Sequence, residues 1–128
     1  MKKTLLLSLF VALTIVATAQ TQRTVLLEHF TQASCGPCAS INPRVQPILD
    51  SNEDRVVSIK YQTSWPGFDP MHNHNPGDAN GRSSYYGVTS VPNSVLDGVG
   101  PGSSVAVITQ AAINNRKNFA SPFKIDLE

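Results

Sequence analysis

The segment TVLLEHF, from Thr24 to Phe30, leads directly to SCGPCAS at residues 34–40, which holds the only two cysteines of the chain. The first segment is β-branched and apolar, so it predicts a buried strand. From Cys38 to Asp50, apolar side chains recur at helical spacing and predict a helix with one buried stripe. Both cysteines therefore lie where a strand passes into a helix, and this junction constrains the fold more than any other feature.

Two prolines, Pro43 and Pro47, fall within this predicted helix. Proline inside a helix removes a backbone hydrogen bond and bends the axis. We therefore expect a kink near Pro43 and the end of the helix near Pro47.

Strands and helices alternate along the rest of the chain. Residues 55–61 (RVVSIKY) predict a second strand, residues 76–86 a short helix capped by Asn75, and residues 93–97 a third strand that ends in a glycine-rich turn through Gly102. A last helix is expected after a cap at Ser103 or Ser104. This order predicts an α/β fold with helices on both faces of the sheet.

The N-terminus has the pattern of a signal peptide at residues 1–19, with Lys2 and Lys3, an apolar run, and a small-residue cleavage site at residues 17–19. The apolar run is too short to span a bilayer comfortably, and no cysteine follows the cut to carry a lipid. We therefore expect an exported protein with one domain at residues 20–120 and no transmembrane segment after cleavage. Residues 121–128 (SPFKIDLE) are either an edge strand or the start of a following, truncated β-rich region.

Composition limits the kind of partner. The chain is 41% apolar and 15% charged, which suits one domain with a modest core and argues against disorder. Its formal net charge is +1 and its basic residues form no stripe, so nothing attracts a phosphate backbone. Nucleic acid is therefore not an expected partner.

The spacing of the two cysteines bears on three uses. A structural disulfide stabilises more when it closes a longer loop, and a bridge from Cys35 to Cys38 closes almost none. A zinc site would add His72 and His74, but the H-x-H spacing fits structural zinc sites poorly, and both are more simply polar loop residues. Export to an oxidising compartment favours the third use, a disulfide that exchanges electrons.

Position along the predicted helix assigns the two sulfurs. Cys35 lies at the helix start, where unpaired backbone amides and the helix dipole stabilise a thiolate. Cys38 lies one turn further on, within reach of a mixed disulfide formed at Cys35. Gly36 lets the backbone turn, and Pro37 stiffens the open loop. We expect Cys35 to be the nucleophile and Cys38 the buried resolving cysteine.

A strand leading into CGPC, a proline five residues after the second cysteine (Pro43), and Val91–Pro92 before a later strand resemble the thioredoxin superfamily over roughly residues 24 to 120. The resemblance implies a three-layer α/β/α sandwich, here with a loop and helix insertion after the second strand. It also implies that the proline matching Pro92 is cis and lies against the cysteines, with the backbone of Val91 pairing with substrate.

A narrower resemblance rests on the segments VLLEHFTQASCGPC, FDPMHNHNP and YYGVTSVPNSVLDG. They are similar to those of a group of exported Gram-negative proteins known as outer-membrane proteins of about twenty-eight kilodaltons. This resemblance implies a location in the periplasm, in the outer membrane or at the cell surface. It also implies that SPFKIDLE begins the β-rich region of a longer protein.

Two positions depart from the thioredoxin pattern. An aromatic residue commonly precedes the first cysteine, where this chain has Ser34. Thioredoxins carry a buried acid six residues before that cysteine, where this chain has His29 beside Glu28. Neighbouring strand residues point to opposite faces, so only one of these two can face the cysteines. If His29 does, it accepts the proton of Cys38; otherwise it is a hydrogen-bonded, half-buried side chain.

The insertion after the second strand carries Trp65, Phe68 and Met71. Aromatic and thioether groups supply adaptable contact area. These side chains therefore either form a hydrophobic lip for an unfolded polypeptide, with Trp65 as a substrate contact, or pack the insertion onto the domain.

The pattern as a whole predicts an exported thiol-disulfide oxidoreductase. It would exchange the Cys35–Cys38 disulfide with cysteines of envelope proteins or with a thiol-disulfide electron donor. No bound cofactor and no metal are required, because the disulfide itself carries the electrons. The competing hypothesis is a thioredoxin-like binding or adhesion module of the outer membrane whose disulfide is idle.

Overall fold

The computed structural model describes residues 21–104 and 108–123, and for residues 100–104 the backbone alone. The signal peptide predicted at residues 1–19 and the last part of the C-terminal segment, residues 124–128, lie outside this range. Within it, no helix combines the length and the apolar character needed to cross a membrane.

The described residues form a four-stranded sheet at the centre of the fold. β1 (Val25–Thr31) pairs in parallel with β2 (Val56–Gln62) and, on its other side, antiparallel with β3 (Asn93–Leu96). β4 (Val99–Ser104) pairs antiparallel with β3, which gives the order β2-β1-β3-β4. The chain that leaves the end of β1 therefore emerges from the middle of the sheet.

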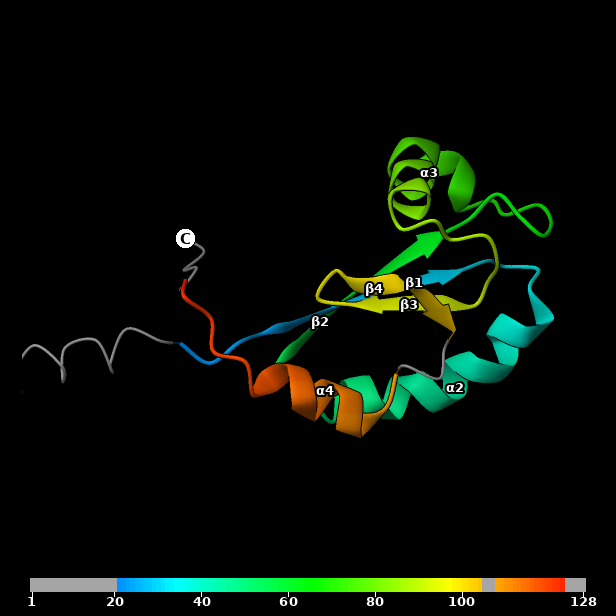
Figure 1. Cartoon of the computed structure of the whole chain (residues 1–128). Helices are drawn as coiled ribbons and strands as arrows, with labels where there is room; N and C mark the ends of the chain where they lie inside the picture. The colour runs from blue at the N-terminus through cyan, green and yellow to red at the C-terminus, as the bar shows by residue number, and fades with distance from the viewer. Residues whose placement is uncertain (1–20, 105–107, 124–128) are drawn as a thin grey trace, which may run out of the picture.

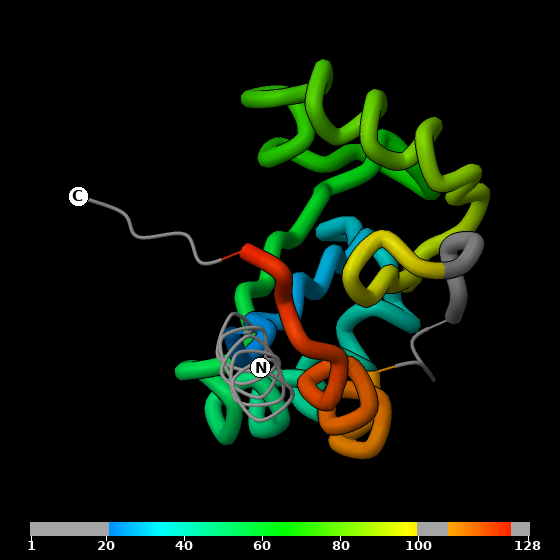
Figure 2. The backbone as a smooth tube through the Cα atoms, turned by 60° about the vertical axis from the view of Figure 1, so that its left-hand side comes forward, coloured from blue at the N-terminus to red at the C-terminus, as the bar shows by residue number. Residues whose placement is uncertain are grey.

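Helices cover both faces of this sheet (Figure 1). α2 (Gly36–Asp50) and α4 (Gln110–Lys117) lie on one face, and α3 (Pro76–Tyr85) lies on the other, preceded by the 3₁₀ helix η1 (His72–His74). The turned view in Figure 2 shows the same layers. The structure confirms the expected α/β/α sandwich with a loop and helix insertion after the second strand.

Alternation along β1 gives each face its own core. Leu27 is fully buried in a cluster with Val45 of α2 and Ile113 of α4. Phe30 is fully buried on the other face, where it clusters with Tyr86 and stacks on Tyr61 with ring centroids 5.3 Å apart. β1 therefore joins two cores, and its consecutive side chains enter different environments.

α2 contains both prolines and continues to Asp50, so the helix end expected near Pro47 is wrong. The predicted apolar stripe is present, because Val45 is buried and Ile41, Ile48 and Leu49 pack against the same core. An internal proline costs a helix about 3 kcal/mol, but packing of an amphipathic face supplies most helical stability in a folded protein.

The region after β3 differs from the expected glycine-rich turn through Gly102. The turn consists of Asp97 and Gly98, with φ of 51° and 67°, and the chain then returns as β4. Asp-Gly with two positive φ values is typical of a two-residue β-hairpin. Ser103 and Ser104 consequently lie in β4, and the cap of α4 is Thr109, whose side chain accepts the Ala112 N–H at 3.1 Å.

The C-terminal segment is described as far as residue 123. Ser121 forms an isolated antiparallel bridge with Thr21, and no longer strand is assigned to residues 121–123. Both expectations for residues 121–128 therefore remain predictions.

Candidate functional site

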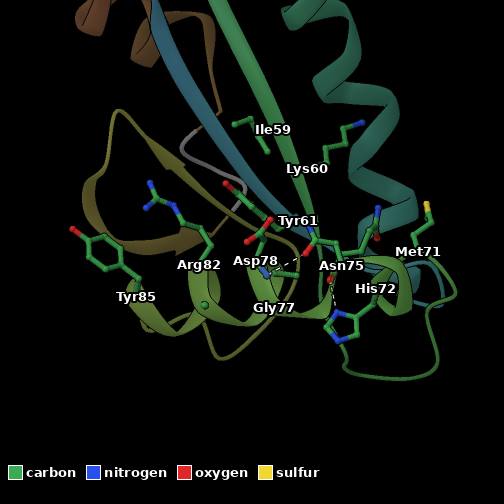
Figure 3. A pocket seen from close by; sticks show the side chains of 13 residues that line it. Ile59, Lys60, Tyr61, Met71, His72, Asn75, Gly77, Asp78, Arg82 and Tyr85 are labelled. Carbon is green, nitrogen blue, oxygen red and sulfur yellow. Dashed lines mark hydrogen bonds between the residues drawn. The ribbon is translucent and has the colours of Figure 1, made fainter.

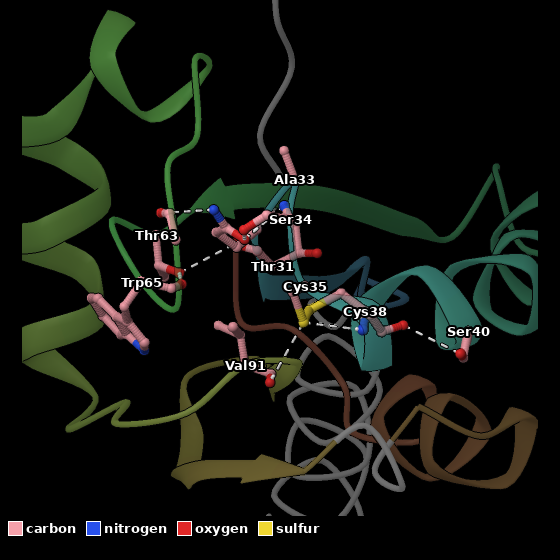
Figure 4. Close-up of a disulfide and its surroundings, with 12 residues drawn as sticks. Thr31, Ala33, Ser34, Cys35, Cys38, Ser40, Thr63, Trp65 and Val91 are labelled. Atoms are coloured by element: carbon pink, nitrogen blue, oxygen red, sulfur yellow. Dashed lines mark hydrogen bonds between the residues drawn. A yellow bond between two sulfur atoms is a disulfide. The ribbon is translucent and has the colours of Figure 1, made fainter.

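The two cysteines form a disulfide at the N-terminus of α2, with their Cα atoms 5.2 Å apart (Figure 4). Cys35 is the N-cap residue, and its Sγ accepts the N–H of Cys38 at 3.1 Å. The first sulfur thus lies against a helical amide, as predicted. A negative charge is stabilised at such a position, because the first amides of a helix lack partners within it.

Little of either cysteine is exposed in the disulfide form. Cys38 is 1% exposed and Cys35 4%, while Ser34, Gly36 and Pro37 around them are exposed. The expected contrast between an accessible and a buried sulfur is therefore weak in this state. An exchange partner has to approach Cys35 through the side formed by the exposed loop.

The Val91–Pro92 peptide bond is cis and lies beside the disulfide, as the resemblance implies. The carbonyl oxygen of Val91 is 3.8 Å from Cys35 Sγ (Figure 4). Trp65, followed by a second cis bond to Pro66, is half-buried and packs against the same aromatic cluster as Val91. The structure brings Cys35 and Val91 together, and Trp65 packs against the same cluster as Val91, which takes up part of its surface.

His29 is fully buried on the face of β1 that α2 covers. Its Nδ1 lies 2.8 Å from Ser94 Oγ of β3, and Asn42, one helical turn after Cys38, faces the ring. Within the described range, neither His29 Nε2 nor Asn42 Oδ1 makes a hydrogen bond of good geometry. Of the pair Glu28 and His29, it is His29 that lies under the cysteine-bearing helix.

The surroundings of His29 keep its imidazole neutral at pH 7. Burial lowers the pKa of His29, and the charge of Lys60 on the neighbouring strand lowers it further, although Asn42 offsets part of this effect. A neutral ring has one nitrogen able to accept a proton. A buried polar atom without a well-formed hydrogen bond is rare, so Nε2 makes His29 a candidate proton acceptor on the α2 face of β1.

Glu28 faces the opposite core and is fully paired. Arg82 of α3 donates to both carboxylate oxygens at 2.5 and 3.0 Å, and the Tyr86 hydroxyl donates at 2.6 Å. Burial by itself raises the pKa of Glu28, but these hydrogen bonds and the Arg82 charge outweigh it and hold the pKa below its ordinary value. Burial and the bond to Glu28 raise the pKa of Tyr86 to about 12. This cluster fastens α3 to β1 and is remote from the disulfide face.

Two buried side chains that the sequence analysis did not single out, Gln32 and Asp69, join the cysteine loop to the insertion. Gln32 Nε2 donates to the Gly67 carbonyl at 2.9 Å, and its Oε1 accepts from both N and Oγ of Ser34 at 2.7 Å. Asp69 Oδ2 accepts the Ala33 N–H at 2.8 Å, while its Oδ1 accepts from the backbone of the insertion. The Asp-Pro dipeptide at residues 69–70 signals a side-chain-capped turn, but nothing local signals the long-range bond.

His72 and His74 lie in η1, away from the cysteines. The ring of His72 is buried and its Nδ1 lies 2.8 Å from the Gln62 carbonyl oxygen, whereas His74 is exposed. Across residues 21–104 and 108–123, no three His, Cys, Asp or Glu side chains come together in a way that could hold a metal ion.

A separate open groove of about 870 Å³ lies between β2 and α3 (Figure 3). Ile59, Tyr61, Met71, Arg82 and Tyr85 are among the residues that line it, and neither cysteine does. The groove and the disulfide are therefore two distinct surfaces.

No family model and no curated protein matches the sequence. Solved structures do match. Tryparedoxin from Trypanosoma brucei is 15% identical, with a TM-score of 0.50 over 72% of this chain and 77% of its own. Thioredoxin O2 from Arabidopsis thaliana, in the oxidized state, is 23% identical, with a TM-score of 0.43 over 59% of this chain and 57% of its own. Mitochondrial thioredoxin 3 from Saccharomyces cerevisiae, in the oxidized form, is 21% identical, with a TM-score of 0.43 over 63% of each chain.

This chain therefore spans less than two thirds of the length of those two thioredoxins. Identities this low bear on the fold and not on substrates or partners. The sheet order, the helices on both faces, the disulfide at the start of α2 and the similarity to tryparedoxin agree. We conclude that the chain has a thioredoxin-like fold.

Proposed function

We propose that this protein is a thiol-disulfide oxidoreductase. The observation that carries the proposal is the position of Cys35. Its sulfur caps α2 and accepts a hydrogen bond from the backbone N–H of Cys38, and the same sulfur is bonded to Cys38, one helical turn away. That position lowers the free energy of a thiolate, which is both the attacking species and the better leaving group in disulfide exchange.

The proposed reaction proceeds through two exchanges. In the reduced protein, the Cys35 thiolate attacks one sulfur of a substrate disulfide, forms a mixed disulfide and releases the other substrate sulfur as a thiolate. The Cys38 thiolate then attacks the Cys35 sulfur, restores the Cys35–Cys38 bond and releases the second substrate thiolate. Two electrons pass from the protein to the substrate, and the two released thiolates take up protons. The reverse sequence oxidises a substrate dithiol.

His29 is the proposed acceptor of the Cys38 proton during the second exchange. It lies on the face of β1 that α2 covers, is neutral at pH 7, and its Nε2 makes no hydrogen bond of good geometry within the described range, although Asn42 faces the ring. A base beneath the resolving thiol makes its thiolate available when the mixed disulfide has formed. Val91 and Pro92, beside Cys35, are proposed to position the substrate backbone, and Trp65 to support that side of the site.

The proposed substrates are cysteine-containing proteins of the bacterial envelope, and the proposed location is the periplasm or the outer membrane. This part rests on the signal-peptide pattern and on the resemblances of the sequence. An oxidising compartment is also where a disulfide such as Cys35–Cys38 persists.

The low exposure of Cys35 favours a second candidate, a binding or adhesion module with an idle disulfide. One experiment separates the two. We expect the wild-type protein to equilibrate with glutathione buffers and to reduce insulin, and Cys35→Ser to be inactive in both assays.

Cys38→Ser is the matched control, because it keeps the first sulfur and removes only the resolving one. It should accumulate a mixed disulfide with glutathione that mass spectrometry detects. If the wild-type disulfide never exchanges, the proposed oxidoreductase activity is refuted and the binding module remains as the proposed function.

A further inference from the structure

We propose that Phe68 is a substrate-contact residue, which selects polypeptides that carry an apolar side chain a few residues from the exchanging cysteine. The inference rests on the proposed function and adds a substrate class to it. Three observations lead to it: how the insertion is anchored, how closely it approaches the cysteine loop, and how its apolar side chains differ in exposure and position.

The residues on both sides of Phe68 are anchored to the cysteine loop. The carbonyl of Gly67 accepts a hydrogen bond from Gln32 at 2.9 Å, and the carboxylate of Asp69 accepts one from Ala33 at 2.8 Å. Gln32 and Asp69 are each 3% exposed, so water competes little for these bonds. Phe68 is consequently held between two fixed points and does not sit at a free loop tip.

The insertion also touches the residue that precedes Cys35. A Cβ atom on Gly67 would lie 2.5 Å from Ser34 Oγ, closer than real Cβ contacts. A side chain at position 67 would therefore force the Ser34 hydroxyl to move, and glycine lets the insertion lie directly against Ser34. Phe68 follows directly, so its backbone is one residue from a contact with the neighbour of the reactive sulfur.

The apolar side chains of the insertion differ in what they contact. Trp65 is half-buried in the aromatic cluster, whereas Phe68 is 74% exposed. Met71 is 52% exposed but lines the separate groove beside α3. An exposed aromatic ring on an anchored segment of backbone offers apolar contact area at low cost in conformational entropy. Of the two sequence hypotheses for this insertion, packing describes Trp65 and the hydrophobic lip describes Phe68.

The occupant is a polypeptide, because of where the substrate is held during exchange. In substrate reduction the Cys35 thiolate attacks one sulfur of a substrate disulfide, the substrate S–S bond breaks, and its electron pair leaves with the other substrate sulfur. The captured chain then extends from Cys35 at roughly 3.3–3.6 Å per residue. A side chain two to four residues from its cysteine therefore reaches Phe68, while a small thiol such as glutathione offers no apolar group there.

The test compares a large and a small substrate in the same variants. For Phe68→Ala we expect the KM for insulin reduction to rise about five- to tenfold with kcat little changed, and the rate constant for oxidised glutathione to stay within about twofold. In Phe68→Leu the KM for insulin should fall most of the way back to the wild-type value. Phe123→Ala is the matched control, because Phe123 is 76% exposed and lies at the other end of the sheet.

Two results would overturn the inference. One is an insulin KM for Phe68→Ala equal to that of the Phe123 control, and the other is an equal loss with insulin and glutathione. Wild-type protein that exchanges with neither substrate would instead refute the proposed function, and this inference with it.

Discussion

Glu28 and His29 are consecutive residues of β1, and each is at most 1% exposed. Their side chains nevertheless lie on opposite faces of the sheet and in different surroundings. Glu28 faces α3, where a guanidinium and a phenol satisfy both carboxylate oxygens. His29 faces α2. Its Nδ1 lies 2.8 Å from Ser94 Oγ of β3, and its Nε2 makes no hydrogen bond of good geometry within the described residues, although Asn42 of α2 faces the ring. β1 thus carries a fully hydrogen-bonded ionic cluster on one face and, on the other, a base whose Nε2 lacks a well-formed hydrogen bond within the described residues.

The two faces of β1 are therefore expected to serve different purposes, stability on the Glu28 face and proton transfer on the His29 face. A fully satisfied buried network holds its parts in a single arrangement, and removing one member leaves a costly unpaired charge. A buried neutral base with a free nitrogen adds little to stability but can take up a proton. We therefore expect mutations on the Glu28 face to change unfolding and mutations on the His29 face to change exchange rates.

The largest expected effect is on stability, in Glu28→Gln. Breaking a buried ion pair costs about 3–5 kcal/mol, and we expect about 2 kcal/mol here because the Arg82 side chain is 37% exposed and stays partly hydrated. Urea unfolding at pH 7 measures it. Glu53→Gln, at an exposed position, is the control and should stay within about 0.5 kcal/mol of wild type. Equal stabilities of the two variants would remove the structural role assigned to Glu28.

The next effect is kinetic, in His29→Gln. An amide can replace the bond to Ser94 but cannot accept the Cys38 proton, so we expect release of the mixed disulfide to slow about tenfold, which corresponds to about 1.4 kcal/mol. Stopped-flow measurement of product release after rapid mixing with a disulfide substrate isolates this step. Glu28→Gln serves as the reciprocal control and should release product at the wild-type rate. A His29 variant with an unchanged rate would assign the proton to another acceptor.

The smallest effect concerns the pH ranges in which the two faces lose stability. The pKa of His29 lies below its ordinary 6.5, so below about pH 6.5 the unfolded chain binds a proton that the folded protein does not, and stability falls until the pH reaches the folded-state pKa. The pKa of Glu28 also lies below its ordinary 4.5, so its contribution is complete above about pH 4.5 and is lost as the pH falls through the folded-state value.

Unfolding free energies measured from pH 7.5 to 5 should therefore decline in the wild type and decline less in His29→Gln. Glu28→Gln should keep the wild-type slope in this range. If His29→Gln keeps that slope too, the ring titrates normally and is not the neutral base described above.

Local sequence signals predicted much of the framework. The apolar run of β1, the cysteines at the start of α2 and the cap and proline of α3 each depend on neighbours in the chain, and all three elements are present. β4 was missed because Asp97 and Gly98 form a tight hairpin, while the glycines that follow suggested a longer turn. The helix end at Pro47 was misplaced because tertiary packing of α2 outweighs a local proline penalty.

The site was predictable only where its chemistry is local. The roles proposed for Cys35 and Cys38 rest on their spacing of three residues, whereas the choice between Glu28 and His29 depends on which helix covers which face. The bond between Asp69 and Ala33 joins residues 36 positions apart, and that between Arg82 and Glu28 joins residues 54 apart. No pattern in one segment specifies such pairs, because each partner is an ordinary polar residue until the fold brings them together.

The close contact between Gly67 and Ser34 has a consequence for how sequences of this kind can diverge. A bulky aromatic residue at position 34 would have to turn away from the insertion, and any residue larger than glycine at position 67 would displace the side chain at position 34. The two sites should consequently change together: homologues that restore an aromatic residue next to the first cysteine are expected to have shortened or rerouted this insertion, and to have lost the neighbouring phenylalanine that it presents.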